Sequence, residues 1–139
     1  MKKLLVAGLL MMAGAAAAQE SAQDYYGILR EMMGDGYTEA LKPQTGVLAS
    51  GERRLIKLTF TQPGEYMGLA ACDVGCADMD LYLFDEQGNL VTTDEEDDSF
   101  PILDFEVGKS KTYYAEVAMF DCDEEEGCNY MVGFYRSED

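Results

Sequence analysis

The sequence predicts an all-β domain, an antiparallel sandwich or barrel, with one short helix before it. From residue 45 onward, apolar and polar residues alternate with a period of two in short segments. Turns that contain Gly or Pro separate these segments at close spacing, a pattern typical of sandwiches and barrels. No segment alternates a strand with a helix and no Gly-rich phosphate loop is present, which excludes a nucleotide-binding α/β fold.

The first eighteen residues have the pattern of a secretory signal peptide. Lys2 and Lys3 come before an uncharged run over residues 4–19, and the alanines at 16–18 fit a cleavage site. The uncharged run has 16 residues, fewer than the about 20 that a membrane-spanning helix needs. We therefore expect a signal peptide over 1–18, export to a bacterial periplasm or to the medium, and no membrane span in the mature chain.

A short amphipathic helix is expected over residues 23–33, within an N-terminal segment that covers 19–44. Ser21 and Asp24 have the spacing of a capping box, and Gly34 ends the pattern. The apolar residues of the helix lie at helical spacing on one face: Tyr25, Ile28, Leu29 and Met32. This face is expected to pack on the main domain, and docking to a partner is the alternative.

Seven strands are expected in a β-domain that covers residues 45–139. They cover residues 54–60, 65–71, 80–84, 90–93, 102–107, 112–120 and 129–136. A further strand over 46–49 would make eight. The turns over 61–64, 86–89 and 108–111 are rich in the Gly, Pro, Asn and Ser residues that favour reversals of the chain.

The composition excludes several classes of function. The 139 residues include 27 acidic and 10 basic side chains, a net charge of −17, which becomes −19 when the signal peptide is removed. Nucleic acids and anionic membranes would repel such a chain. Histidine is absent, which excludes Ser-His-Asp and Cys-His catalysis and any His-ligated metal. The hydrophobic fraction of 47% is enough for a buried core.

The acidic residues are expected to gather at one end of the domain. If successive strands run antiparallel, the connections over 72–78, 94–99 and 121–128 share an end, which we call the acidic pole. These three connections hold 12 of the 27 acidic residues and all four cysteines. Three explanations stay open: solubility, a site for a hard cation, and electrostatic attraction of a basic partner protein.

Calcium is the cation that such loops would favour, because it takes six to eight oxygen ligands. Asp78 and Asp80 flank one residue and therefore project to the same side of the expected strand. The candidate ligands at the bases of the loops are Asp78, Asp80, Asp94, Asp121 and Asp123. No loop fits the Asp-x-Asp-x-Asp-Gly calcium pattern, so calcium remains an alternative to binding without a cofactor.

The four cysteines are expected to form two disulfides, because an exported chain with an even cysteine count favours disulfides over a metal site. Local pairs, Cys72–Cys76 and Cys122–Cys128, are favoured over pairs that cross between loops. A zinc site would need all four thiolates, and the spacings do not match those of zinc knuckles. No Cys-x-x-Cys redox motif is present.

Catalysis is disfavoured. A hydrolase that uses paired carboxylates is the enzymatic alternative, but the acidic residues lie mostly in consecutive runs. Solvation keeps such residues ionised, and no apolar pocket that would raise a carboxyl pKa is evident. Sugar binding by tyrosine stacking is a further alternative that the absence of tryptophan weakens. We expect a noncatalytic binding or stabilising module with no catalytic residues.

The stretches over 77–85, 88–91, 101–107 and 112–117 resemble the bacterial pre-peptidase C-terminal domain. That family has an Asp-Leu-Tyr-Leu strand, found here over 80–83, a Gly turn, and a Thr-Tyr-Tyr strand, found here over 112–114. The resemblance implies an antiparallel jelly-roll-like β-sandwich of 7–8 strands that serves as an accessory to a secreted protease. Some related modules bind calcium or collagen, and Asp78 and Asp80 match the family's Asp pair.

Overall fold

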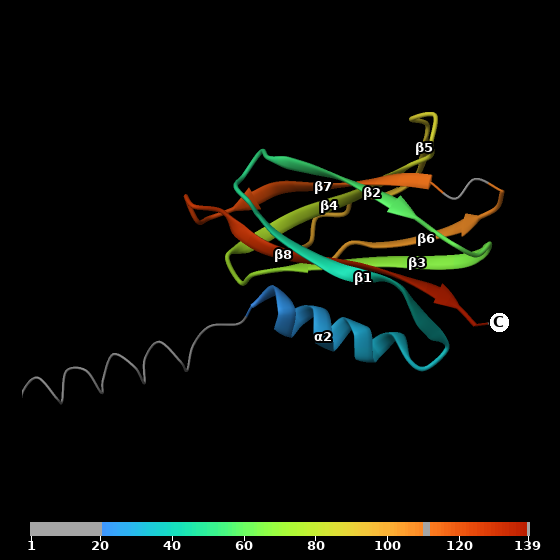
Figure 1. The fold of residues 1–139 in the computed structure, drawn as a ribbon. Coiled ribbons are helices and arrows are strands. Elements are labelled where there is room, and N and C mark those ends of the chain that lie inside the picture. Colours follow the sequence, from blue (N-terminus) through green and yellow to red (C-terminus); the bar gives the residue numbers. More distant parts are fainter. Residues whose placement is uncertain (1–20, 110–111, 139) are drawn as a thin grey trace, which may run out of the picture.

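Two four-stranded antiparallel sheets lie face to face, and helix α2 (Ala22–Met33) covers the outer face of one of them (Figure 1). The computed structural model describes residues 21–109 and 112–138. The signal peptide expected over 1–18 lies outside the described residues. The antiparallel sandwich with a short N-terminal helix confirms the predicted fold class.

The strand order is β1-β8-β3-β6 in the first sheet and β2-β7-β4-β5 in the second. The strands are β1 (Tyr37–Leu48), β2 (Arg53–Thr59), β3 (Gly64–Cys72), β4 (Cys76–Phe84), β5 (Leu90–Asp94), β6 (Ile102–Val107), β7 (Thr112–Cys122) and β8 (Cys128–Ser137). Every connection except that of the β4–β5 hairpin passes from one sheet to the other. An eight-stranded double sheet with crossing connections is a jelly roll.

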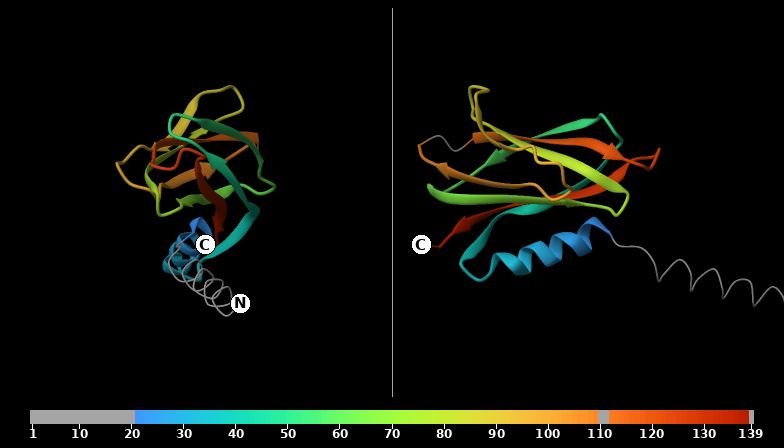
Figure 2. Two further views of the ribbon diagram at one scale, coloured as in Figure 1. Left: turned by 90° about the vertical axis from the view of Figure 1, so that its left-hand side faces the viewer. Right: turned by 180° about the vertical axis from the view of Figure 1, so that it is seen from behind.

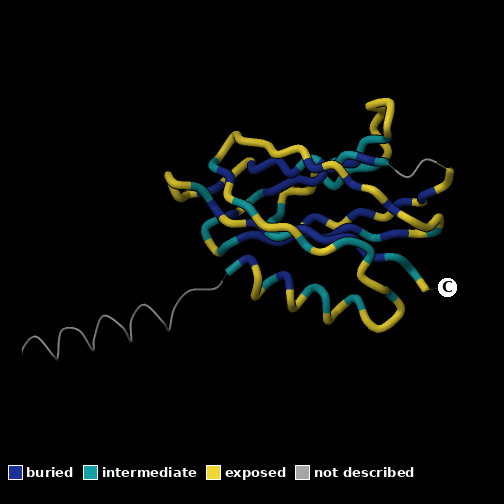
Figure 3. Tube along the Cα trace, viewed as in Figure 1, coloured by how far each residue is buried: buried dark blue, intermediate teal, exposed yellow. Residues whose placement is uncertain are grey.

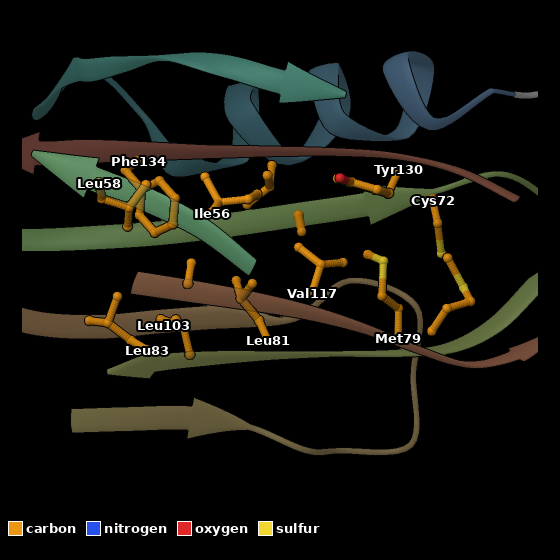
Figure 4. Packing of buried hydrophobic residues seen from close by; sticks show 14 of the residues in the cluster. Ile56, Leu58, Cys72, Met79, Leu81, Leu83, Leu103, Val117, Tyr130 and Phe134 are labelled. Carbon is orange, nitrogen blue, oxygen red and sulfur yellow. The ribbon is translucent and has the colours of Figure 1, made fainter. Parts of the chain in front are cut away.

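The core lies between the sheets and is built from alternate residues of each strand. On β4 and β7, for example, Leu81 and Val117 are fully buried and pair across the sheet, while Tyr82 and Glu116 beside them face outward. Figure 4 shows Leu58, Leu81 and Val117 projecting into this layer from different strands. Figure 3 shows that buried residues concentrate in the strands, whereas the connections are largely exposed.

Strand β1 is longer than expected, because only its last residues fall within the stretch 46–49. It begins at Tyr37, so the expected boundary between an N-terminal segment and a domain starting at residue 45 lies inside this strand. Two register shifts, between Glu39 and Leu41 and between Leu41 and Gln44, interrupt the alternation of its side chains. A proline is tolerated in this strand because β1 is an edge strand.

Helix α2 begins with the expected capping box. The Ser21 hydroxyl accepts a hydrogen bond from the Asp24 amide at 3.2 Å, and the Asp24 carboxylate accepts one from the Ser21 amide at 3.2 Å. Gly34 ends the helix at a φ of 87°, a left-handed conformation that favours glycine. The helix therefore starts and stops where local chemistry predicts.

The face that α2 turns to the sheet agrees only in part with the expected one, because Tyr25 and Leu29 pack on the sheet as expected but Ile28 and Met32 do not. Tyr26 is buried and shares a 2.7 Å hydrogen bond with the Tyr135 hydroxyl, whereas Ile28 and Met32 are 54% and 76% exposed. Tyr25-Tyr26 and Met32-Met33 are pairs of identical residues. A helix face that includes Tyr26 and Met33 therefore has the same apolar spacing as one that includes Tyr25 and Met32. A Cβ on Gly133 would overlap the Tyr26 hydroxyl, and this close approach selects the buried stripe.

Candidate functional site

The connections of the acidic pole are joined to each other by hydrogen bonds. Ser50, in the β1–β2 turn, accepts a hydrogen bond from the Cys122 amide at 2.7 Å and donates one to the Cys122 carbonyl at 2.9 Å. The Asp123 amide donates to the Gly75 carbonyl at 2.9 Å, which links the β7–β8 and β3–β4 connections. These loops lie together at the left end of the sandwich in Figure 1 and at the right end of the rear view in Figure 2.

Two disulfides close rings within this end of the molecule. Cys72 pairs with Cys76 and Cys122 pairs with Cys128, and the Cα–Cα distance is 6.0 Å in each pair. All four cysteines are buried. Each ring closes one acidic connection upon itself, so the backbone of the pole has little freedom to relax away from its own negative charge.

One acidic residue of the pole, Asp73, is fully engaged in holding the fold. Its carboxylate accepts hydrogen bonds from the Ala22 amide at 2.9 Å and from the Asn129 amide and side-chain nitrogen, each at 2.8 Å. These bonds tie the first turn of α2 to β8. Charge-assisted bonds of this kind are among the stronger ones in proteins, so Asp73 has a structural role.

Asp94 has a comparable role in the β5–β6 connection. Its carboxylate accepts hydrogen bonds from the Glu96 amide at 3.0 Å and from the Ile102 amide at 2.8 Å. The connection then continues beside β4, where the Met79 amide donates to the Asp98 carbonyl at 3.0 Å. This path brings the acidic run over 94–98 along the start of β4.

Asp78 and Asp80 project from the outer face of β4 and form a close carboxyl pair. Asp80 is only 5% exposed, and the Oδ1 atom of each side chain is buried without a hydrogen-bond partner. Burial, followed by the charges of Asp78 and Glu95, raises the pKa of Asp80 to about 6. Burial, followed by the charge of Asp97, raises the pKa of Asp78.

The elevated pKa of Asp80 differs from the expectation that solvation keeps the acidic residues, which lie mostly in consecutive runs, ionised. Glu124 and Glu125 lie in such a run and are exposed, whereas Asp80 lies in β4 and is buried. The alternation along β4 places Asp78 and Asp80 together, whereas the approach of Glu95 and its neighbours depends on the path of a long connection. No local pattern in the sequence reports such a path.

The five candidate calcium ligands do not form one cluster. Asp121 lies opposite Asp78 in the register of β4 and β7, but Asp121 and Asp123 are exposed. Asp94 is occupied by backbone amides. Over residues 21–109 and 112–138, no group of three or more acidic or cysteine side chains is positioned to hold a metal ion.

The negative charge of the pole is not neutralised by the described basic residues. None of the 12 acidic residues of the pole forms a salt bridge with a described lysine or arginine. Arg53, which enters β2 at this end, instead pairs with Glu116 at 2.9 Å and lies over the rings of Tyr82 and Phe120. The pole therefore presents carboxylates to the solvent whose charge no described cation neutralises.

The fold is that of a two-layer antiparallel β-sandwich, and among solved structures it is similar to the pre-peptidase C-terminal domain. The chain matches that domain of the Bacillus anthracis collagenase with a TM-score of 0.52 and 16% identity over 67% of this chain and 87% of that one. No protein-family model matches the sequence, and no curated protein sequence matches it. The likeness shows the fold that the sequence predicted.

Two more distant similarities have lower scores. Pseudomonas aeruginosa AlgX matches with a TM-score of 0.48 and 12% identity over 68% of this chain and 26% of AlgX. Aeromonas hydrophila PliG, a periplasmic inhibitor of g-type lysozyme, matches with a TM-score of 0.44 and 13% identity over 76% of this chain and 88% of PliG. Within the described ranges, no helix is long and apolar enough to cross a membrane.

Proposed function

We propose that this chain is an exported, noncatalytic binding module that holds a basic protein at its acidic pole. The observation that carries the proposal is the set of acidic side chains that no described cation neutralises, on loops of which two are closed by disulfides and joined to each other by a hydrogen bond. An array of this kind attracts a basic surface at long range and selects its orientation. The net charge, −17 for the full sequence and −19 without the expected signal peptide, adds to this attraction.

The rigidity of the pole favours binding for a second reason. Free energy is lost when loops must become ordered on association, and that loss is smaller when the loops are already fixed. The two disulfides and the Ser50 and Gly75 hydrogen bonds fix them before any partner arrives. The pole therefore binds as a preformed surface.

A capture experiment with matched charge variants tests this function. The pole variant carries Glu124→Gln, Glu125→Gln and Glu126→Gln, three exposed positions in the β7–β8 connection. The control variant has the same net charge through substitutions at exposed positions of β3 and β6: Glu65→Gln, Asp104→Asn and Glu106→Gln. The native chain and both variants are immobilised, and soluble exported proteins of the source cells are passed over them.

We expect the native chain and the control variant to retain a basic protein that moderate salt elutes, and the pole variant to lose it. Equal retention by the two variants would show that only net charge matters, and failure of the native chain to retain any basic protein would also refute the proposal. A secreted protease is the partner that the resemblance implies, and the same experiment identifies it.

N-terminal sequencing of the mature protein tests export, with Gln19 as the expected first residue.

A divalent cation at Asp78 and Asp80 is a second candidate function, favoured by their two buried oxygens without partners. A bound Ca²⁺ would accept these oxygens as ligands and relieve the charge repulsion that, after burial, raises both pKa values. The pair fits part of a calcium shell, and backbone carbonyls and water would complete it. Millimolar calcium should then raise the melting temperature of the native chain but not that of an Asp80→Asn variant. No shift in the native chain at low salt refutes this candidate.

A further inference from the structure

An apolar groove of about 340 Å³ lies at the acidic pole, between α2, the β3–β4 connection and the β5–β6 connection. The helix contributes Tyr25, Ile28 and Leu29 to it, and the disulfide between Cys72 and Cys76 lies along its wall. The groove is distinct from the Asp78 and Asp80 pair, which faces outward from the other sheet. Figure 1 shows α2 beneath the first sheet, with its N-terminal end at the same end of the molecule as the acidic loops.

Three large apolar side chains on the rim of this groove are exposed to solvent. Ile28 is 54% exposed, Val74 is 66% exposed and Phe100 is 48% exposed. Val74 directly follows Asp73, and Phe100 lies two residues after Asp98, where an acidic run ends. Solubility alone would favour polar residues at these positions. An apolar cluster with a polar rim is typical of an interaction surface.

The groove is held open by the contacts around it. Asp73, in its wall, accepts a hydrogen bond from the Ala22 amide and so fixes the start of α2 against the β3–β4 connection. The Phe100 amide donates to the Asp98 carboxylate at 3.1 Å, which fixes the turn that presents the Phe100 ring. The groove is therefore formed before a partner binds, which lowers the free-energy cost of ordering the site on binding.

The charges around the groove define the chemistry of its occupant. Asp73 lines it, Asp98 supports its rim, and no described lysine or arginine lines it. An apolar cavity beside carboxylates that no described cation neutralises is complementary to an apolar side chain that has basic residues on both sides. An acidic segment would be repelled, and a wholly apolar one would supply no cation for the negative charge of these carboxylates.

We propose that this groove receives one segment of the basic partner, in which one or two large apolar residues are flanked by lysine or arginine. This inference rests on the proposed function and names the part of the partner that is recognised. The apolar residue enters between Ile28 and Phe100, and the flanking cations face the carboxylates of the pole. Burial of the apolar residue supplies affinity, and the cations supply orientation and fast association.

A labelled synthetic peptide with a leucine pair flanked by lysines tests the proposal, and an analogue with serines in place of the leucines is its control. The groove variants are Ile28→Ser and Phe100→Ser, both at exposed positions that should tolerate a polar residue. The matched control is Leu90→Ser, which is equally exposed at 54% but lies where β5 begins, at the opposite end of the sandwich. Binding is measured by fluorescence anisotropy at low and at physiological salt.

We expect the leucine peptide to bind the native chain and the Leu90→Ser variant alike, and each groove variant about tenfold more weakly. The serine analogue should bind weakly to all of them. If both peptides bind equally and Phe100→Ser has no effect, the proposal that the groove binds an apolar residue is refuted. The proposal of a basic partner at the acidic pole is not affected by that result. A change in oligomeric state caused by Ile28→Ser, without a change in peptide affinity, assigns the groove to self-association and also overturns the proposal.

Discussion

The substitution Asp80→Asn should remove a pH dependence that the buried carboxyl pair builds into the stability of the sandwich. The Asp80 carboxyl is 5% exposed, and its pKa rises from 3.8 to about 6, first because of burial and then because of the charges of Asp78 and Glu95. The folded chain therefore holds this proton more tightly than the unfolded chain does. Protonation favours folding here, unlike at a carboxylate in an ion pair.

The sign and size of the effect follow from these two pKa values. The stabilisation is complete below about pH 4 and is lost as the pH rises through about 6, where the folded chain must ionise a buried group. One pKa unit corresponds to about 1.4 kcal/mol, so a rise from 3.8 to about 6 corresponds to about 3 kcal/mol. Asparagine cannot ionise, so the variant should lack this loss.

Urea unfolding at several pH values, in the presence of a chelator, measures the effect. The readout is the difference in unfolding free energy between Asp80→Asn and the native chain, which should change by about 3 kcal/mol in favour of the variant between about pH 4 and about pH 8. A buried asparagine amide changes the unfolding free energy by the same amount at every pH, whereas ionisation of Asp80 changes it only as the pH rises. Measurement at several pH values therefore separates the two effects. Asp104→Asn, at an exposed position of β6, is the control and should show no such trend. A difference that stays constant with pH would refute the reasoning.

Three further variants test the contacts that shape the domain, each by urea unfolding at neutral pH. Gly133→Ala should cost about 1–3 kcal/mol because its methyl group would overlap the Tyr26 hydroxyl, and a Tyr26→Phe background should reduce that loss. Asp73→Ala should cost about 2–4 kcal/mol because three backbone and side-chain donors lose a charged acceptor. Replacing Cys72 and Cys76 together by alanine should cost about 2 kcal/mol, the value expected for a short ring. An ordinary surface substitution changes the free energy of unfolding by less than about 0.5 kcal/mol. A loss in that range would show that the contact removed by the variant does not stabilise the fold.

The fold was predictable where one face of a strand is buried and the alternation is regular. In β7, Tyr113, Ala115 and Val117 are buried at every second position, so the period of two reports the strand directly. In β1 the register shifts and the proline destroy that period, and β1 pairs only with β8. Its strand conformation comes from tertiary pairing, which a local pattern does not encode.

The candidate site was predictable only in part, for the same reason. The spacing of Asp78 and Asp80 requires that they share a face, whereas the burial of Asp80 depends on the path of the β5–β6 connection beside β4. Likewise, the spacing in α2 indicates an amphipathic helix but does not choose between adjacent stripes. The fit of Tyr26 over Gly133 makes that choice, and it leaves Ile28 at the rim of the groove.

The β5–β6 connection links the two proposed ligands of the pole. The charge of Asp97 is, after burial, the next largest cause of the raised pKa of Asp78, and Phe100, three residues later, forms part of the groove rim. A cation at Asp78 and Asp80 would reduce the negative potential beside the groove, so millimolar calcium should weaken binding of the leucine–lysine peptide. By linkage, the peptide should weaken calcium binding by the same factor. Peptide titrations with calcium, or with sodium chloride at equal ionic strength, measure this coupling. If calcium weakens the peptide equally in the native chain and in Asp80→Asn, the effect is general screening and the two sites are independent.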